Sequence, residues 1–83
     1  MSDRVTVLLF AAVREVVGAS EVTLAIDGAS TASSLLSALC ERVPALTPYV
    51  PSLRVAVNGA YVGPDDAVKA GDEVAIIPPV AGG

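Results

Sequence analysis

The sequence contains no histidine and only one cysteine, Cys40. A zinc site and a Cys-His nucleophile both require histidine or several cysteines, so the chain lacks the residues for either. A single cysteine also excludes an intramolecular disulfide, which fits a reducing compartment. There is no Walker loop and no GxGxxG segment, and no metal site is expected. The chain therefore has almost no side-chain chemistry with which to act as an enzyme alone.

Charge and long apolar runs are also scarce. Only 17% of the residues are charged, and the formal net charge is −4. An acidic surface repels phosphate backbones and anionic lipid, so we expect neither nucleic acid nor a membrane as a partner. No segment reaches the ~20 apolar residues that span a bilayer. Asp3 and Arg14-Glu15 flank the first apolar run with charges that do not suit a signal peptide, so we expect a cytoplasmic protein.

The chain has 83 residues, of which 53% are hydrophobic but only 4% are aromatic. This length allows one domain, and its core must come from valine, leucine, isoleucine and alanine. We expect a folded domain over residues 1–77 and an extended tail over residues 78–83.

β-Branched and alternating segments predict five strands, and the first of them reads as buried on both faces or nearly so. The Asn58-Gly59 pair predicts a tight hairpin, and Asp27-Gly28 predicts another turn. The predicted strands cover residues 4–10, 21–26, 53–57, 60–62 and 73–77.

Helical periodicity occurs in one long segment, which begins with an N-cap at Ser30 or Thr31 and is ended by Pro44. A short helical turn over 11–17 is ended by Gly18. Because of its prolines, the segment 45–51 is expected to be a connecting loop. This order predicts an α+β fold of the β-grasp, ubiquitin-like type. One main helix packs on one face of a mixed sheet, with the first and last strands adjacent at its centre.

Two carboxylate pairs, Asp65-Asp66 and Asp72-Glu73, could suggest a metal or acid-base site. Aspartates in turns usually accept local backbone hydrogen bonds, and we favour that interpretation. Cys40 follows an apolar helix position and is expected to be a small residue at the edge of the core.

The unusual feature is the end of the sequence, Pro78-Pro79-Val80-Ala81-Gly82-Gly83. Two prolines prevent further strand pairing, and six extended residues reach about 20 Å. Glycines without Cβ atoms let a terminal carboxylate enter a narrow cleft. That carboxylate is a poor electrophile until a partner activates it, most simply as an acyl-adenylate formed with ATP. The competing interpretation is that the end of the chain is frayed and has no function.

Four segments of the chain resemble the family of ubiquitin-fold sulfur carriers that includes the small subunit of molybdopterin synthase. They bracket nearly the whole chain, and the Phe-Ala-x-x-Arg-Glu motif together with Pro-Pro-Val-x-Gly-Gly is a specific combination. The segments are 7–15, 55–58, 70–74 and 78–83.

The resemblance implies that a ubiquitin-activating-like adenylyltransferase uses ATP to adenylate Gly83, and that a sulfur donor converts it to a thiocarboxylate. The tail, with Pro79, Val80, Ala81 and Gly82, is then inserted into the active site of the large subunit. There the sulfur passes to cyclic pyranopterin monophosphate, and two small subunits flank a dimer of large ones. The resemblance implies a sulfur-donor subunit that is not catalytic alone and holds no permanent cofactor.

A carrier that binds two enzymes in turn is expected to dock through an apolar patch beside the root of its tail. Phe10, Pro79 and Val80 are candidates, with Arg14 as a charged anchor. Phe10 could instead belong to the core, and Arg14 could form a surface pair with Glu15 or a neighbour.

Three alternative functions remain open at this point. The chain could be a sulfur carrier for thiamine, cysteine or transfer-RNA thiolation, although the front segment and the Pro-Pro-Val favour molybdopterin. It could be a ubiquitin-like modifier that forms isopeptide bonds with lysines of target proteins. It could also be a small binding module whose tail is inert.

Overall fold

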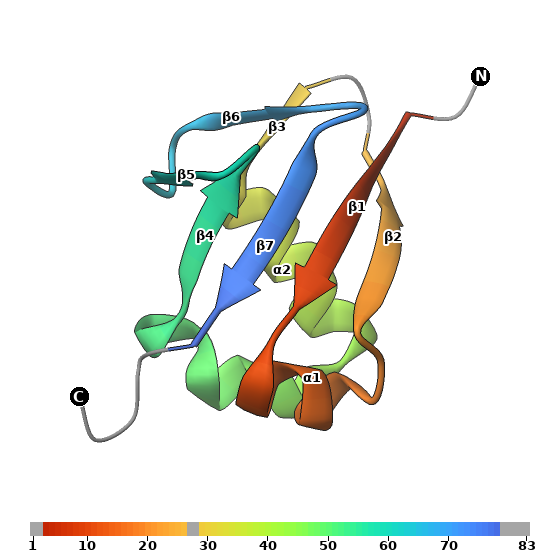
Figure 1. Cartoon of the computed structure of the whole chain (residues 1–83), viewed down its shortest axis with the longest axis vertical. Helices are drawn as coiled ribbons and strands as arrows, with labels where there is room; N and C mark the ends of the chain where they lie inside the picture. Colours follow the sequence, from red (N-terminus) through yellow and green to blue (C-terminus); the bar gives the residue numbers. More distant parts are fainter. Residues whose placement is uncertain (1–2, 27–28, 79–83) are drawn as a thin grey trace.

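A five-stranded mixed sheet with one long helix across a single face forms the body of the chain (Figure 1). The computed structural model describes residues 3–26 and 29–78, so the predicted turn at Asp27-Gly28 lies outside the described residues. In chain order the elements are β1 (Arg4–Leu9), α1 (Ala11–Val17), β2 (Glu21–Ala25), β3 (Ala29–Thr31), α2 (Ala32–Arg42), η1 (Pro44–Ser52), β4 (Arg54–Val57), β5 (Ala60–Val62), β6 (Ala67–Lys69) and β7 (Glu73–Ile77).

The first and last strands lie side by side at the centre of the sheet. The strand order is β2-β1-β7-β4-β5, and β1 and β7 are parallel with Val7 opposite Val74. The other neighbouring strands of this sheet are antiparallel. Parallel neighbours require a crossover connection, and α2 lies on that connection. The predicted β-grasp arrangement is therefore confirmed.

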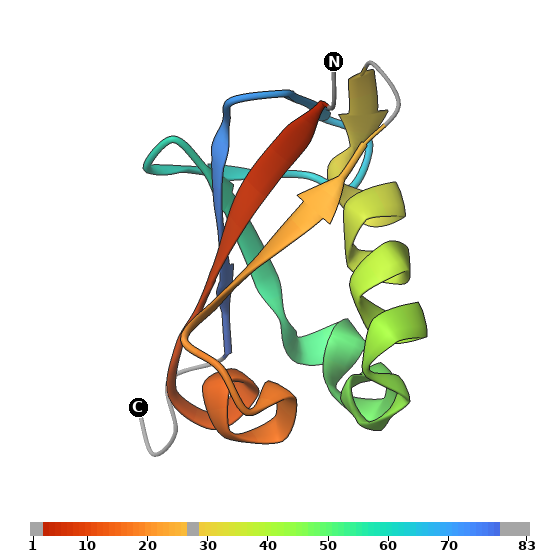
Figure 2. The same cartoon turned by 90° about the vertical axis from the view of Figure 1, so that its right-hand side faces the viewer.

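The core lies between the sheet and α2, and only one face of the sheet is covered (Figure 2). Val5 and Val7 of β1 point into this core and are each 1% exposed. Thr6 and Leu8 alternate with them and are only partly buried, because no helix covers the opposite face. The first strand is therefore buried on one face and half-buried on the other, which is less than the burial on both faces, or nearly so, expected from the sequence.

Both predicted helices form where the sequence placed them. Thr31 is the N-cap of α2, and its Oγ1 accepts a hydrogen bond from the backbone N–H of Ser34 at 3.1 Å. Gly18 ends α1 in the left-handed region at φ 84°, which a glycine adopts without steric cost. The buried stripe of α2 consists of Ala32, Leu35, Leu36 and Leu39.

The segment that follows α2 is a 3₁₀-helix, η1, rather than the predicted loop. The fixed φ of Pro48 and Pro51 lies near that of a 3₁₀-helix, so prolines that end an α-helix are tolerated here. Leu46 is fully buried and ties η1 to the core.

A second sheet, formed by β3 and β6, was not predicted. Each strand has three residues, which is too short for alternation to be read from the sequence. Ser30 lies opposite Val68, whose side chain is fully buried.

Candidate functional site

The root of the tail lies at the end of the central strand of the sheet. β7 ends at Ile77, which lies opposite Arg54 of β4, and Pro78 follows without a ladder bond, as predicted. The strand that leads to the tail is thus held between β1 and β4. The five predicted tail residues lie outside the described part of the chain, and their roles stay predictions. They are Pro79, Val80, Ala81, Gly82 and Gly83.

The face of the sheet turned away from α2 carries a continuous row of apolar side chains. The register sets Leu8 opposite Ala75 and Ala75 opposite Ala56. Ala56 in turn lies opposite Tyr61, and directly opposed residues share one face. Ile77 lies on this face one step nearer the tail root. We call Leu8, Ala56, Tyr61, Ala75 and Ile77 the apolar patch. In it Tyr61 is exposed, Leu8, Ala75 and Ile77 are half-buried, and Ala56 is buried.

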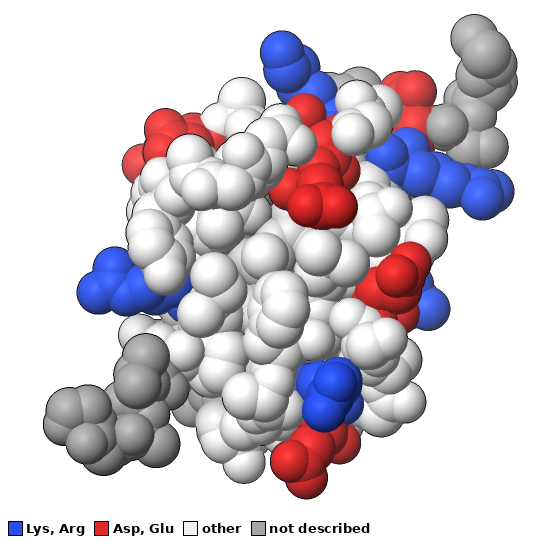
Figure 3. All heavy atoms as spheres, in the orientation of Figure 1, with Lys and Arg blue, Asp and Glu red and all other residues white. Residues whose placement is uncertain are grey.

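Figure 3 looks onto this face, and its centre is uncharged, with acidic and basic side chains around the margin. An uncharged centre has few polar groups to desolvate when a partner covers it. The margin supplies charges that can orient the partner. This distribution suits a docking surface with an apolar middle.

Phe10 extends the patch toward the end of the sheet where the tail begins. It follows β1 directly, one residue after Leu9, which lies opposite Ile76. Its backbone carbonyl accepts the N–H groups of Val13 and Arg14 at 3.1 and 3.3 Å, which opens α1. Its side chain is 47% exposed, so the structure favours the surface interpretation over the core.

Arg14 lies on the exposed side of α1, close in sequence to Phe10. Within residues 3–26 and 29–78, no ion pair joins it to Glu15. The surface pair that competed with an interface role is therefore absent from the described chain. The interface role of Arg14 stays a prediction.

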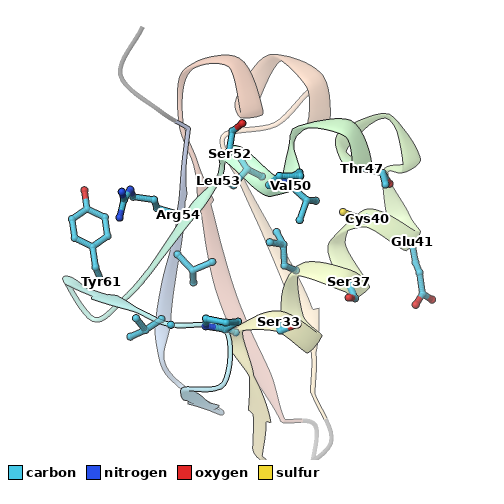
Figure 4. A pocket seen from close by; sticks show the side chains of 17 residues that line it. Ser33, Ser37, Cys40, Glu41, Thr47, Val50, Ser52, Leu53, Arg54 and Tyr61 are labelled. Atoms are coloured by element: carbon cyan, nitrogen blue, oxygen red, sulfur yellow. The ribbon is translucent and has the colours of Figure 1, made fainter. Parts of the chain in front are cut away.

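Sequence reasoning missed two residues of this face, Arg54 and Tyr61. The guanidinium carbon of Arg54 lies 5.9 Å from the centroid of the Tyr61 ring, within cation–π range. Figure 4 shows the two side chains next to each other, on the side of the strands turned away from α2. The sequence could have indicated the position of Tyr61, because a two-residue turn at Asn58-Gly59 sets the hairpin register and places Tyr61 opposite Ala56.

A groove of about 870 Å³ lies between α2, η1 and the β4–β5 hairpin, and Arg54 and Tyr61 are among the residues that line it (Figure 4). α2, η1 and β4–β5 line it, with Val50 and Leu53 among its apolar residues and Ser37 among its polar ones. Cys40 also lines it and is half-buried against the core, which confirms the prediction of a core-edge residue. The groove holds no group of side chains that suggests a reaction.

The two carboxylate pairs serve the turns. Asp66 accepts the backbone N–H of Gly63 at 2.7 Å, and Asp72 accepts that of Lys69 at 2.9 Å. The Lys69 bond and then the Asn58 amide hold the pKa of Asp72 below its ordinary value of 3.8, since both stabilise the carboxylate. Among the residues that the structure describes, no cluster of His, Cys, Asp or Glu could hold a metal ion. None of the described helices is long and apolar enough to cross a membrane.

Comparison with known proteins identifies a family and relatives that match the chain. The model of the ThiS family matches residues 7–83. The "Molybdopterin synthase sulfur carrier subunit" of Chlamydomonas reinhardtii is 46% identical over 83 residues, covering 96% of this chain and 99% of the relative.

Solved structures support the fold in the same way. A crystal structure of SAMP1, a small archaeal modifier protein from Haloferax volcanii, superposes with a TM-score of 0.88 at 35% identity. It covers 96% of this chain and 99% of the other. A complex of subunits 1 and 2 of the molybdopterin-converting factor from Helicobacter pylori matches with a TM-score of 0.63 at 22% identity, over 96% and 99% of the two chains. This last likeness shows the fold alone.

Proposed function

The chain belongs to the ThiS family, and on that premise we propose that it is the sulfur carrier subunit of a molybdopterin synthase. Relatives of that name are 36–46% identical over nearly the whole chain. The observation that carries the proposal is the position of the tail root. It lies at the end of the central strand, beside an apolar patch, in a chain whose described part has no cluster of side chains that could hold a metal ion.

The reactive group in this proposal is the carboxylate of Gly83. A ubiquitin-activating-like adenylyltransferase joins it to AMP from ATP and releases pyrophosphate. A sulfur donor then displaces AMP, which leaves a thiocarboxylate. Transfer of the sulfur to cyclic pyranopterin monophosphate, with water supplying oxygen, restores the carboxylate. ATP is consumed by the activating enzyme, and the carrier holds no permanent cofactor.

The large subunit supplies the catalytic side chains, and this chain supplies reach and docking. Pro78 starts the tail at a fixed point, because β7 is held on both sides by β1 and β4. Pro79, Val80, Ala81 and Gly82 carry small side chains or none, so they fit a narrow channel. Burial of the tail keeps out bulk water, which would hydrolyse the activated acyl group before the sulfur is transferred.

The apolar patch is the surface on which the large subunit and the activating enzyme bind in turn. Phe10 enlarges it next to the tail root, and Arg14 adds a charge near its edge. We place two small subunits on a dimer of large ones, in the cytoplasm. The single cysteine and the absence of a disulfide are consistent with that compartment.

Reconstitution with a Gly83 deletion tests the proposal. The full chain, loaded with sulfur, is expected to form molybdopterin from cyclic pyranopterin monophosphate when the large subunit is present. The chain without Gly83 is expected to form none, because the tail is one residue short and cannot present the sulfur. Full molybdopterin formation by the deleted chain would sink the mechanism.

A second candidate is a protein modifier, favoured by the close likeness to SAMP1. It shares the activation of Gly83 but joins the carbonyl to a lysine amine rather than to sulfur. Mass spectrometry of trypsin-digested cell extracts, searched for lysines that carry residues 70–83 of this chain, distinguishes the two, because Lys69 is its last basic residue. Such conjugates would support the modifier, and the free thiocarboxylated chain supports the carrier.

A further inference from the structure

We propose that Arg54, held in place by Tyr61, is the positioning residue that anchors the docked large subunit through a carboxylate of that partner. This inference rests on the proposed function and adds the kind of group, a carboxylate, that the large subunit presents to Arg54. The prediction from sequence gave the anchoring charge to Arg14, whereas the structure offers a second arginine at the tail root itself.

The first argument is position. Arg54 lies directly opposite Ile77, and Ile77 is followed at once by Pro78. Neighbouring strands are about 4.8 Å apart, so the backbone of Arg54 lies one strand spacing from the tail root. A surface that receives the tail closely enough to exclude water must therefore cover Arg54.

The second argument is the state of its side chain. In the part of the chain that the structure describes, the side chain of Arg54 interacts only with Tyr61, and no carboxylate pairs with it. This is notable in a chain with nine acidic and five basic residues. The Tyr61 ring, 66% exposed, supports the face of the guanidinium and leaves its N–H donors available at the edge.

The third argument concerns what the partner must supply. Docking would take Arg54 out of water, and a desolvated guanidinium without a partner is costly. A planar guanidinium pairs best with a carboxylate, through two parallel N–H···O bonds. The surface of the large subunit is thus expected to place an aspartate or glutamate beside the mouth of its tail channel.

The pair also explains how an apolar patch can define one orientation. Leu8, Ala75 and Ile77 offer contacts without direction, which leave the partner free to slide or rotate. A single cation at one end of this row fixes the register of the partner relative to the tail. Arg54 would then aim the tail at the channel without touching the reacting sulfur.

The test measures binding of the full chain to the large subunit of molybdopterin synthase from the same organism, over a range of salt concentrations. Arg54→Gln removes the charge and keeps most of the stem. Lys69→Gln is the matched control, because it removes one positive charge from the exposed edge of β6, outside the five-stranded sheet. We expect Arg54→Gln to weaken binding by about 10-fold and to flatten its salt dependence, and Lys69→Gln to change neither.

Two further variants separate charge from packing. Arg54→Lys is expected to keep the salt dependence and to recover part of the affinity, because it keeps the charge without the planar fork. Tyr61→Phe is expected to bind like the unaltered chain, whereas Tyr61→Ala is expected to weaken binding, because the ring that holds the guanidinium is gone. In sulfur-transfer assays Arg54→Gln should raise KM and leave kcat unchanged.

Equal binding and equal salt dependence of Arg54→Gln and Lys69→Gln would overturn the inference and leave the proposed function standing. Weaker binding of Arg54→Gln with unchanged salt dependence would also overturn it, since packing rather than charge would then be responsible. No binding by the unaltered chain would instead refute the proposed function on which the inference rests.

Discussion

The side chains of Asn58 and Asp72 join the hairpin that carries Tyr61 to the strand that carries the tail. Nδ2 of Asn58 donates a hydrogen bond to Oδ1 of Asp72 at 3.1 Å, and Oδ1 of Asn58 accepts the backbone N–H of Glu73 at 3.0 Å. Oδ2 of Asp72 accepts the backbone N–H of Lys69 at 2.9 Å. One amide and one carboxylate thus hold the start of β7 against the β4–β5 turn.

This arrangement predicts a specific acid sensitivity. The pKa of Asp72 in the folded chain lies below its ordinary value of 3.8, so the carboxylate stabilises the fold above that pH. The stabilisation is lost as the pH falls through the lowered value, because the proton then binds both states. We expect Asp72→Asn to reduce the free energy of unfolding at neutral pH, and the difference from the unaltered chain to shrink below pH 3.8.

Urea unfolding at a series of pH values measures this difference. Asp65→Asn is the control. Asp65 lies in the turn before β6, and within the described residues its carboxylate accepts no hydrogen bond. A deficit of Asp72→Asn that stays constant through the acidic range would show that the carboxylate charge is not the cause.

Phe10 and Tyr49 provide a matched test of the docking surface, because each side chain is 47% exposed. Phe10 lies at the tail root, whereas Tyr49 lies in η1 outside the apolar patch. We expect Phe10→Ala to weaken binding of the large subunit by about 10-fold or more, since aromatic anchors dominate such interfaces. Tyr49→Ala should bind normally in the same titration calorimetry experiment, and equal losses would remove Phe10 from the proposed surface.

The hairpin turn depends on backbone conformation at Gly59. Its φ is 87°, and an added Cβ would contact nothing within 4 Å, so any cost of Gly59→Ala comes from the backbone alone. We expect a loss of about 1 kcal/mol in the free energy of unfolding. Gly63→Ala is the control, because Gly63 is outside the left-handed region and its added Cβ would lie 3.7 Å from Asp66. That variant should unfold like the unaltered chain or be more stable by about 0.5 kcal/mol.

Leu46 tests whether η1 is part of the cooperative core. Its side chain is 0% exposed, and Leu46→Ala should lower the free energy of unfolding by about 3 kcal/mol. Thr47→Ala, at an exposed position of η1, should change it by less than about 0.5 kcal/mol. Equal stability of the two variants in chemical denaturation would mean that η1 contributes little to the core.

The sequence predicted the sheet because its strands carry local signals. β1 and β7 are rich in β-branched and apolar residues, and Asn58-Gly59 marks the hairpin without ambiguity. The limits of α2 follow from Thr31 and Pro44 for the same reason. η1 was predicted to be a loop because prolines usually interrupt helices. β3 and β6 were not predicted, because three residues are too few to show the alternation of a strand.

The candidate site was predicted less completely, since it depends on contacts across strands. Phe10 was one candidate for the apolar docking patch, and the structure places it on the surface beside the tail root. Arg54 and Tyr61 are seven residues apart in sequence, and only the β4–β5 register brings them onto one face. The tail was recognised from composition and resemblance, which need no coordinates.

The most direct test of the account is the intact mass of the full chain after incubation with its activating enzyme, ATP and a sulfur donor. We predict a shift equal to the exchange of one oxygen for one sulfur, located by fragmentation at Gly83 and absent when ATP is omitted. An unchanged mass under these conditions, or a sulfur found at Cys40 instead of Gly83, would contradict the claim that the carboxyl terminus is the reactive centre.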